Sequence, residues 1–119
     1  MVEGKDLNVS LDFDGTLDNP AIQILVKKLM RCGCQIYILT CRYDDLHRHL
    51  WQPHSTNEDL YLVADILKIP HKNIYFGNML PQFKPKFLHN STIDMHIEND
   101  AKEVEEIETW CPKIKVIKI

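Results

Sequence analysis

The strongest constraint on the fold of this chain is a predicted strand that ends in two acidic residues. Asp12 and Asp14 follow residues 7–11 and are separated by one residue, so on an extended backbone their side chains share one face. Gly15, directly after them, allows a tight turn that exposes main-chain amides. Two carboxylates held this close repel each other, which predicts a cation between them. Mg²⁺, a hard ion with oxygen ligands, meets that need and keeps positions open for a phosphate oxygen.

Residues 12–17, DFDGTL, resemble the first motif of the haloacid dehalogenase-like (HAD) superfamily, a group of mostly Mg²⁺-dependent phosphatases and phosphotransferases. The resemblance implies that Asp12 attacks phosphorus to form an aspartyl-phosphate. It also implies that Asp14 acts first as a general acid and then as a general base, and that Asp12 and the main-chain carbonyl of Asp14 bind Mg²⁺. The alternative is a surface strand that ends in an acidic turn.

Length and composition predict one small domain over residues 1–119, because a chain of this size buries about two-thirds of its unfolded surface on folding. The net charge of −3 provides no general field for polyanions, so nucleic acid is expected only as a substrate. No apolar run reaches the roughly 18 to 20 residues of a membrane span. Residues 1–6, predicted to be a loose leader, lack the apolar core of a signal peptide. We therefore expect a cytoplasmic protein with no membrane partner.

The cysteines and histidines do not follow the spacing of a zinc site. Cys32 and Cys34 are separated by one residue, but no second pair completes a tetrahedron, so reduced structural thiols are favoured. His47 and His49 lie two residues apart, which points them to different faces of a helix.

The rest of the hydrophobic pattern alternates between helix and strand. Strands are predicted at residues 7–11, 35–40, 73–76, 93–97 and 114–119. Helices are predicted at residues 20–32, 43–51, 57–68, 83–88 and 100–110. This alternation implies a three-layer, Rossmann-like, doubly wound α/β fold with a parallel sheet. The HAD resemblance implies the same fold without a cap domain, because neither candidate insertion point leaves room for one.

Three helix boundaries have a local explanation. Asp18 or Asn19 can cap the first predicted helix, and Pro20 suits its first position. Gly33 ends that helix where a left-handed residue is favoured. Thr56 is predicted to cap the helix at residues 57–68.

Thr40 and Arg42 follow the second predicted strand. A strand that ends in a threonine resembles the second HAD motif, in which the Thr40 hydroxyl would bind a phosphate oxygen, assisted by main-chain amides such as that of Gly15. Thr40-Cys41-Arg42 is similar to the Thr-X-Arg of some capless members. Arg42 could therefore clamp an anionic substrate group with its planar fork. The alternatives are a structural threonine and an exposed loop arginine.

Residues 83–88, FKPKFL, resemble the third HAD motif, in which a lysine opens a helix. The chemistry needs a cation there because the attacking carboxylate and the phosphate are both anions. Lys84 is the predicted residue and Lys86 the alternative. A pair of solvated surface lysines is the remaining interpretation.

The chain departs from the family pattern after the fourth predicted strand. Family members usually have aspartates there, whereas this chain has Glu98, Asn99 and Asp100. Glu98 or Asp100 would complete the Mg²⁺ shell, directly or through a water. Asp94 shares the strand face of Glu98 but lies too far from the strand end to act as a ligand.

The resemblance covers residues 7–110 and implies a capless, Mg²⁺-dependent phosphomonoester hydrolase. An open site would admit sugar phosphates, nucleotides or a phosphorylated nucleic-acid end, unless a homo-oligomer partner covers it. The alternative, favoured by the Glu98-Asn99 departure, is a non-catalytic protein that binds phosphate or another anion. Phosphotransfer to an acceptor other than water has the same sequence pattern as hydrolysis.

Overall fold

A computed structural model describes residues 7–119, and the leader predicted at residues 1–6 lies outside this range. The strands are β1 (Asn8–Leu11), β2 (Gln35–Thr40), β3 (Ile74–Phe76), β4 (Met95–Glu98) and β5 (Lys115–Lys118). The helices are α1 (Pro20–Arg31), α2 (Asp45–Trp51), α3 (Glu58–Leu67), α4 (Phe83–His89) and α5 (Ala101–Trp110). Two short helical turns, η2 (Phe13–Leu17) and η3 (His71–Asn73), complete the described elements.

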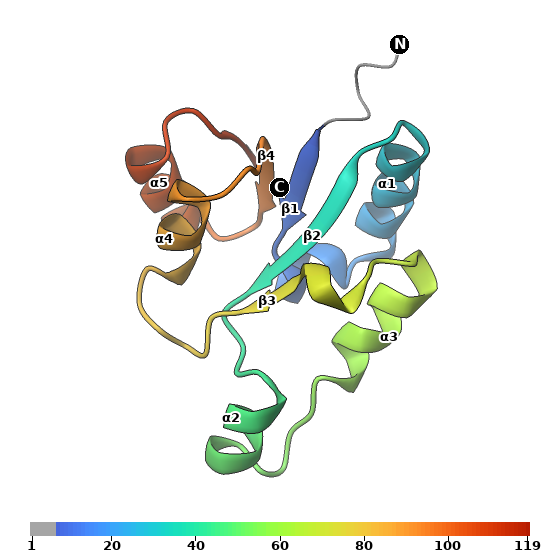
Figure 1. Cartoon of the computed structure of the whole chain (residues 1–119), viewed down its shortest axis with the longest axis vertical. Coiled ribbons are helices and arrows are strands. Elements are labelled where there is room, and N and C mark those ends of the chain that lie inside the picture. The colour runs from blue at the N-terminus through green and yellow to red at the C-terminus, as the bar shows by residue number, and fades with distance from the viewer. Residues whose placement is uncertain (1–6) are drawn as a thin grey trace.

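The five strands form one parallel sheet in the order β3-β2-β1-β4-β5. Helices α1 and α3 cover one face of the sheet, and α4 and α5 cover the other (Figure 1). This arrangement confirms the predicted Rossmann-like α/β architecture. It also places β1 in the centre, where Leu11 pairs with Ile38 of β2 and Ile97 of β4. The carboxyl ends of β1, β2 and β4 therefore meet at one edge, which is where open parallel sheets bind ligands.

The alternation of side chains along the strands divides the interior into two cores. Val9, Leu11 and Ile38 face α1 and α3, whereas Leu39 faces α4 and α5. Ser10, His96 and Glu98 are also fully buried, although they are polar. Buried polar side chains are therefore present within the sheet as well as at its carboxyl edge.

Several sequence-predicted boundaries are confirmed. β2 covers the predicted residues 35–40, and β5 is an edge strand as expected. Asn19 caps α1, since its side chain accepts a hydrogen bond from the Ala21 amide, and Pro20 is the first helical residue. Gly33 has a φ of 91°, the left-handed conformation that its position was expected to need.

Two boundary predictions were wrong. α3 begins at Glu58 with Asn57, not Thr56, at the N-cap position, and the Asn57 side chain makes no cap hydrogen bond. That side chain donates to the Tyr43 carbonyl, before α2, and to Asp45, the first residue of α2, while Thr56 Oγ1 accepts from the Glu58 amide at 3.4 Å. The predicted strand at residues 93–97 begins only at Met95, and Asp94 precedes it.

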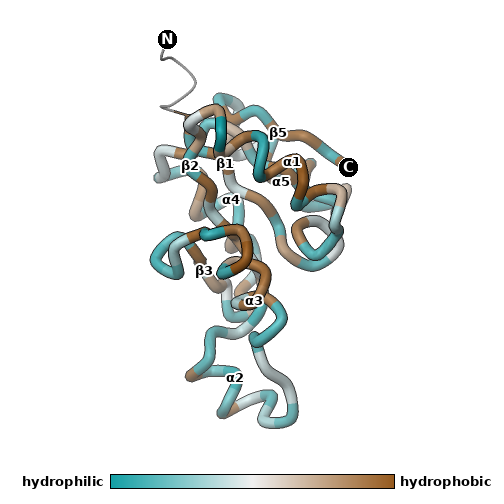
Figure 2. Tube along the Cα trace, turned by 90° about the vertical axis from the view of Figure 1, so that its right-hand side faces the viewer, coloured by the Kyte–Doolittle hydropathy of each residue, from teal (hydrophilic) through white to brown (hydrophobic). Residues whose placement is uncertain are grey.

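The segment around α2 extends beyond the carboxyl edge of the sheet (Figure 1), and Figure 2 shows that it is largely hydrophilic. α2 begins after Asp44, whose carboxylate accepts a hydrogen bond from the His47 amide. The loop after β3 supports this start, because Asn78 Oδ1 accepts from the Asp44 amide. No helix within residues 7–119 is long and apolar enough to cross a membrane.

Candidate active site

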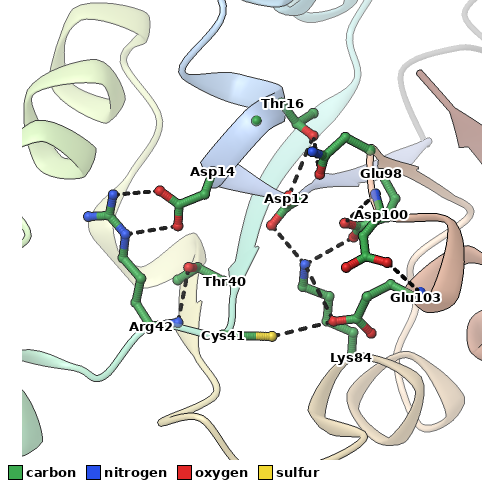
Figure 3. A network of polar contacts seen from close by, with 12 residues as sticks. Asp12, Asp14, Thr16, Thr40, Cys41, Arg42, Lys84, Glu98, Asp100 and Glu103 are labelled. Carbon is green, nitrogen blue, oxygen red and sulfur yellow. Dashed lines mark hydrogen bonds and ion pairs between the residues drawn. The ribbon is translucent and has the colours of Figure 1, made fainter.

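Lys84 lies between two buried carboxylates at the carboxyl edge of the sheet (Figure 3). Its Nζ donates to Asp12 Oδ1 at 2.7 Å and to Glu98 Oε1 at 3.0 Å. The side chain of Lys84 is 2% exposed, that of Asp12 is 10% exposed and that of Glu98 is 1% exposed. An isolated buried charge is costly, so the ammonium group compensates both acids and they compensate it. We call Asp12, Lys84 and Glu98 the inner group.

The first turn of α4 delivers Lys84 to this position. Gly77 directly follows β3 and lies close to the Phe83 ring, because a Cβ added to Gly77 would lie 2.5 Å from that ring. Phe83 is the first residue of α4, and Lys84 follows it directly. Lys86, the alternative lysine, is exposed on the same helix. Of the two candidates, Lys84 is therefore the one that reaches Asp12.

A hydrogen-bonded chain continues from the inner group into the sheet. Glu98 Oε1 lies 2.9 Å from His96 Nε2, and His96 Nδ1 lies 2.7 Å from Ser10 Oγ. The three side chains meet because residues 96 and 98 of β4 and residue 10 of β1 point to the same face. Sequence reasoning had not assigned a role to His96 or Ser10. Polar residues at alternate positions of two buried strands were the available clue.

Burial and charge act on the inner group in different directions. Burial raises the pKa of Asp12 to about 7, against the opposing effect of the Lys84 charge. Burial also opposes ionisation of Glu98, but the hydrogen bond with His96 and the charge of Lys84 outweigh it and lower its pKa to about 2. Burial alone would lower the pKa of Lys84, but the charges of Asp12 and Glu98 raise it by more, so the net shift is upward. Near neutral pH, Glu98 and Lys84 are therefore charged and Asp12 is poised between its two forms.

Asp14 points away from the inner group, so the expectation that it shares a face with Asp12 was wrong. That expectation assumed an extended backbone, whereas the chain enters the η2 turn directly after Asp12, and Gly15 has a φ of 82°. Asp14 Oδ1 accepts from Arg42 Nη2 at 2.7 Å, and its Oδ2 accepts from Arg42 Nε at 3.0 Å (Figure 3). The two aspartates therefore have separate cationic partners.

Arg42 joins Asp14 to α3. Its Nη1 and Nη2 donate to the two carboxylate oxygens of Asp59 at 2.8 and 2.9 Å. The Arg42 side chain is 17% exposed, whereas those of Asp14 and Asp59 are 57% and 60% exposed. The hydrogen bonds with Asp59 and Asp14 raise the pKa of Arg42, and that with Arg42 lowers the pKa of Asp59. We call Arg42, Asp14 and Asp59 the outer group. Sequence reasoning missed Asp59 as a site residue.

The remaining predicted phosphate ligands lie at the same edge. Thr40 is buried at the end of β2, and its Oγ1 accepts from the Arg42 amide at 3.2 Å. The Gly15 amide donates to the Asp18 carboxylate at 3.1 and 3.2 Å. A Cβ on Gly15 would lie 2.2 Å from Asn99 Nδ2, so a larger residue would push the Asn99 side chain aside. The structure thus brings Thr40 and Gly15 to the site, with each already engaged in a hydrogen bond.

The second oxygen of Asp12 faces neutral oxygen atoms. Thr16 Oγ1 lies 3.5 Å from Asp12 Oδ2 and 3.4 Å from Asn99 Oδ1. Asp100, one of the two predicted metal ligands after β4, caps α5 through its Oδ1 at 2.8 Å from the Lys102 amide. Glu98, the other, is held by Lys84 and His96. Within residues 7–119, no three His, Cys, Asp or Glu side chains gather into a cluster that would hold a metal ion.

The chemistry of these donors nevertheless fits Mg²⁺. Mg²⁺ is usually bound through one or two carboxylates, and several waters complete its shell. Thr16 Oγ1 contacts both Asp12 Oδ2 and Asn99 Oδ1, so a carboxylate, a hydroxyl and an amide oxygen lie together. These are hard oxygen donors, and a full cluster of protein side chains is not required.

Cys41 is the nearest thiol to the inner group. Its Sγ donates to Glu103 Oε2 at 3.4 Å, and that oxygen lies 4.0 Å from Lys84 Nζ. Burial raises the pKa of Cys41 to about 11, so the thiol stays protonated near neutral pH. A cysteine nucleophile is therefore not favoured, and Asp12 is the better candidate.

Comparison with known proteins adds no assignment: no family model matches the chain, and no curated protein was found to match it.

Proposed function

We propose that this chain is a Mg²⁺-dependent phosphomonoester hydrolase of the HAD type, without a cap domain, that works through an aspartyl-phosphate on Asp12. The observation that best supports this function is the 2.7 Å contact between Lys84 Nζ and the Asp12 carboxylate at the end of the central parallel strand. An ammonium group in that position would offset the repulsion between the attacking carboxylate and the phosphate.

In the proposed reaction, a carboxylate oxygen of Asp12 attacks phosphorus and the bond from phosphorus to the ester oxygen breaks. Asp14 donates a proton to that leaving oxygen. Water then attacks the aspartyl-phosphate while Asp14 accepts its proton, which releases phosphate and regenerates Asp12. This division replaces one difficult displacement by two easier ones.

The neighbouring groups have supporting roles. Thr40 accepts a hydrogen bond from a main-chain amide and can still donate its hydroxyl hydrogen to a phosphate oxygen. Mg²⁺ would be held by Asp12 and the carbonyl of Asp14, with Glu98 or Asp100 completing the shell directly or through a water, and would neutralise charge on the phosphate when bound. The exposure of the Asp14 carboxylate supports an open site. We propose that this site takes a sugar phosphate, a nucleotide or a phosphorylated nucleic-acid end.

A non-catalytic protein that binds phosphate or another anion is the second candidate. The observation that favours it is the engagement of the acidic residues: Arg42 holds Asp14, and Lys84 and His96 hold Glu98. A protein that only bound anions would not need Asp14 near the bound group. The two candidates therefore differ in whether phosphate is released.

A screen for phosphate release separates these functions. The substrates are sugar phosphates, nucleotides and 3′- or 5′-phosphorylated oligonucleotides, each with Mg²⁺ and with EDTA, and Asp12→Asn is the control. We expect release that needs both the metal and Asp12, while Asp12→Asn keeps the fold. Mg²⁺ binding without turnover of any substrate would instead support the anion-binding protein.

A further inference from the structure

Every N–H group of the Arg42 guanidinium has an acceptor. Nε and Nη2 donate to Asp14 at 3.0 and 2.7 Å, and Nη1 and Nη2 donate to Asp59 at 2.8 and 2.9 Å. The fifth hydrogen bond runs from Nη1 to Asn57 Oδ1 at 3.4 Å. A guanidinium has five N–H donors, so Arg42 is saturated. A substrate phosphate would have to displace a carboxylate or the Asn57 amide oxygen before it could bind there.

The surroundings of Arg42 also fix the plane of its guanidinium. The Phe13 ring lies beneath it, with 5.0 Å between Arg42 Cζ and the ring centroid, a distance typical of a cation–π contact. Phe13 is buried in the η2 turn, whereas Asp59 lies in the first turn of α3. Arg42 therefore packs on the η2 turn through Phe13 and is hydrogen-bonded to α3 through Asp59. Its direction toward Asp14 depends on both contacts.

We propose that Asp59 is a positioning residue that holds Arg42 in place, so that Arg42 fixes the Asp14 carboxylate instead of binding the substrate phosphate. Asp14 and Asp59 share one cation, and removal of either leaves the other to draw the guanidinium toward itself. α3 thereby sets the position of the acid/base residue, although Asp59 touches neither Asp14 nor substrate. We call the hydrogen bonds of Arg42 with Asp14 and Asp59 the clamp. The effect of the clamp on catalysis rests on the proposed function, whereas the clamp itself does not.

Kinetics of Asp59→Asn test the catalytic consequence, with Glu58→Gln as the matched control. Glu58 precedes Asp59 in the same helical turn and is exposed, so its variant removes an equal charge without touching Arg42. We expect Asp59→Asn to lower kcat by about tenfold and to leave KM within about twofold, because an acid/base group is misplaced while phosphate binding is retained. Glu58→Gln should change neither constant. A kcat for Asp59→Asn within about twofold of the wild-type value would show that the position of Asp14 does not depend on Asp59, and would overturn the catalytic part of the proposal.

A second measurement does not depend on activity. In the ¹⁵N-labelled full chain, the Arg42 Nε–H resonance, assigned by its loss in Arg42→Lys, reports whether the clamp is closed. We expect slow exchange with water in the wild-type protein and in Glu58→Gln, faster exchange in Asp59→Asn, and no shift when inorganic phosphate is added. Wild-type exchange in Asp59→Asn, or a shift with phosphate, would overturn the clamp. If these expectations hold and no phosphomonoester is hydrolysed, the proposed function has failed and the clamp has not.

Discussion

The inner and outer groups lie at the same edge of the sheet, and each consists of one cation between two carboxylates. They differ in burial: the side chains of the inner group are at most 10% exposed, whereas the carboxylates of the outer group are 57% and 60% exposed. Removal of one inner charge leaves another uncompensated inside the protein. Water can solvate the two carboxylates of the outer group, so its ion pairs contribute little to stability. Burial therefore determines whether the same arrangement of charges supports the fold as well as the chemistry.

Lys84→Met should have the largest effect, because it leaves Asp12 and Glu98 as neighbouring buried carboxylates. We expect the free energy of unfolding to fall by about 3 to 5 kcal/mol, and phosphate release to be lost. Urea unfolding and a turnover assay measure the two effects. Lys86→Met on the exposed side of α4 is the control, and its unfolding free energy should stay within about 0.5 kcal/mol of wild type. Equal stability of the two variants would remove the distinction between the inner and outer groups.

Asp14→Asn should separate activity from stability. We expect turnover to fall by about 10² to 10⁴-fold, because the general acid and base is lost. The unfolding free energy should change by less than about 1 kcal/mol, because the Asp14 carboxylate is exposed and Asp59 still accepts from Arg42. Asp65→Asn removes another exposed carboxylate, which pairs with His71 on the far side of α3, and should alter neither quantity. A loss of several kcal/mol in Asp14→Asn would mean that the outer group supports the fold as well.

The pH dependence of stability should reveal the inner group, with a smaller effect than either substitution. The pKa of Asp12 is about 7 in the folded protein and 3.8 ordinarily, so its contribution to stability is present below pH 3.8 and is lost as the pH rises through 7. The pH dependence that Glu98 contributes has the opposite sign. Its pKa falls from 4.5 to about 2, so its contribution to stability is present above pH 4.5 and is lost as the pH falls through 2.

Denaturation of the metal-free protein in EDTA checks this dependence. The difference in unfolding free energy between the wild-type protein and Asp12→Asn should decline as the pH rises from 3.8 to 7. Groups other than Asp12 titrate in both proteins and largely cancel in the difference. A difference that stays constant over this interval would show that Asp12 is not poised near neutral pH.

The parts of the fold that follow from local pattern could be predicted from the sequence. An apolar run bounded by Gly33 and Thr40 was enough to define β2, and Asn19 with Pro20 was enough to start α1. Parallel strands end at a common edge, so the strand ends that carry Asp12 and Thr40 lie at the same edge of the sheet. Lys84 was expected at this edge because its motif opens a helix, and α4 begins one residue before it.

The contacts that define the two groups could not be predicted in the same way. Arg42 and Asp59 are 17 residues apart, and Ser10 and His96 are 86 residues apart, so only the packed fold brings them together. The direction of Asp14 depends on the η2 turn, which begins at Phe13, between the two aspartates. Asn57 likewise occupies the N-cap position of α3 but uses its side chain for tertiary hydrogen bonds, while Thr56 Oγ1 accepts from the Glu58 amide.

Detection of phosphate on Asp12 tests the central claim most directly. Asp14→Asn would be mixed with Mg²⁺ and an aryl phosphate, whose leaving group needs no proton, then quenched in acid and analysed by peptide mass spectrometry. The account predicts that the peptide containing Asp12 carries one phosphoryl group, because the variant can form the aspartyl-phosphate but has lost the base that activates water for its hydrolysis. The double variant with Asp12→Asn should carry none. Phosphate release that continues at the wild-type rate in Asp12→Asn, or a phosphoryl group on another residue, would contradict it.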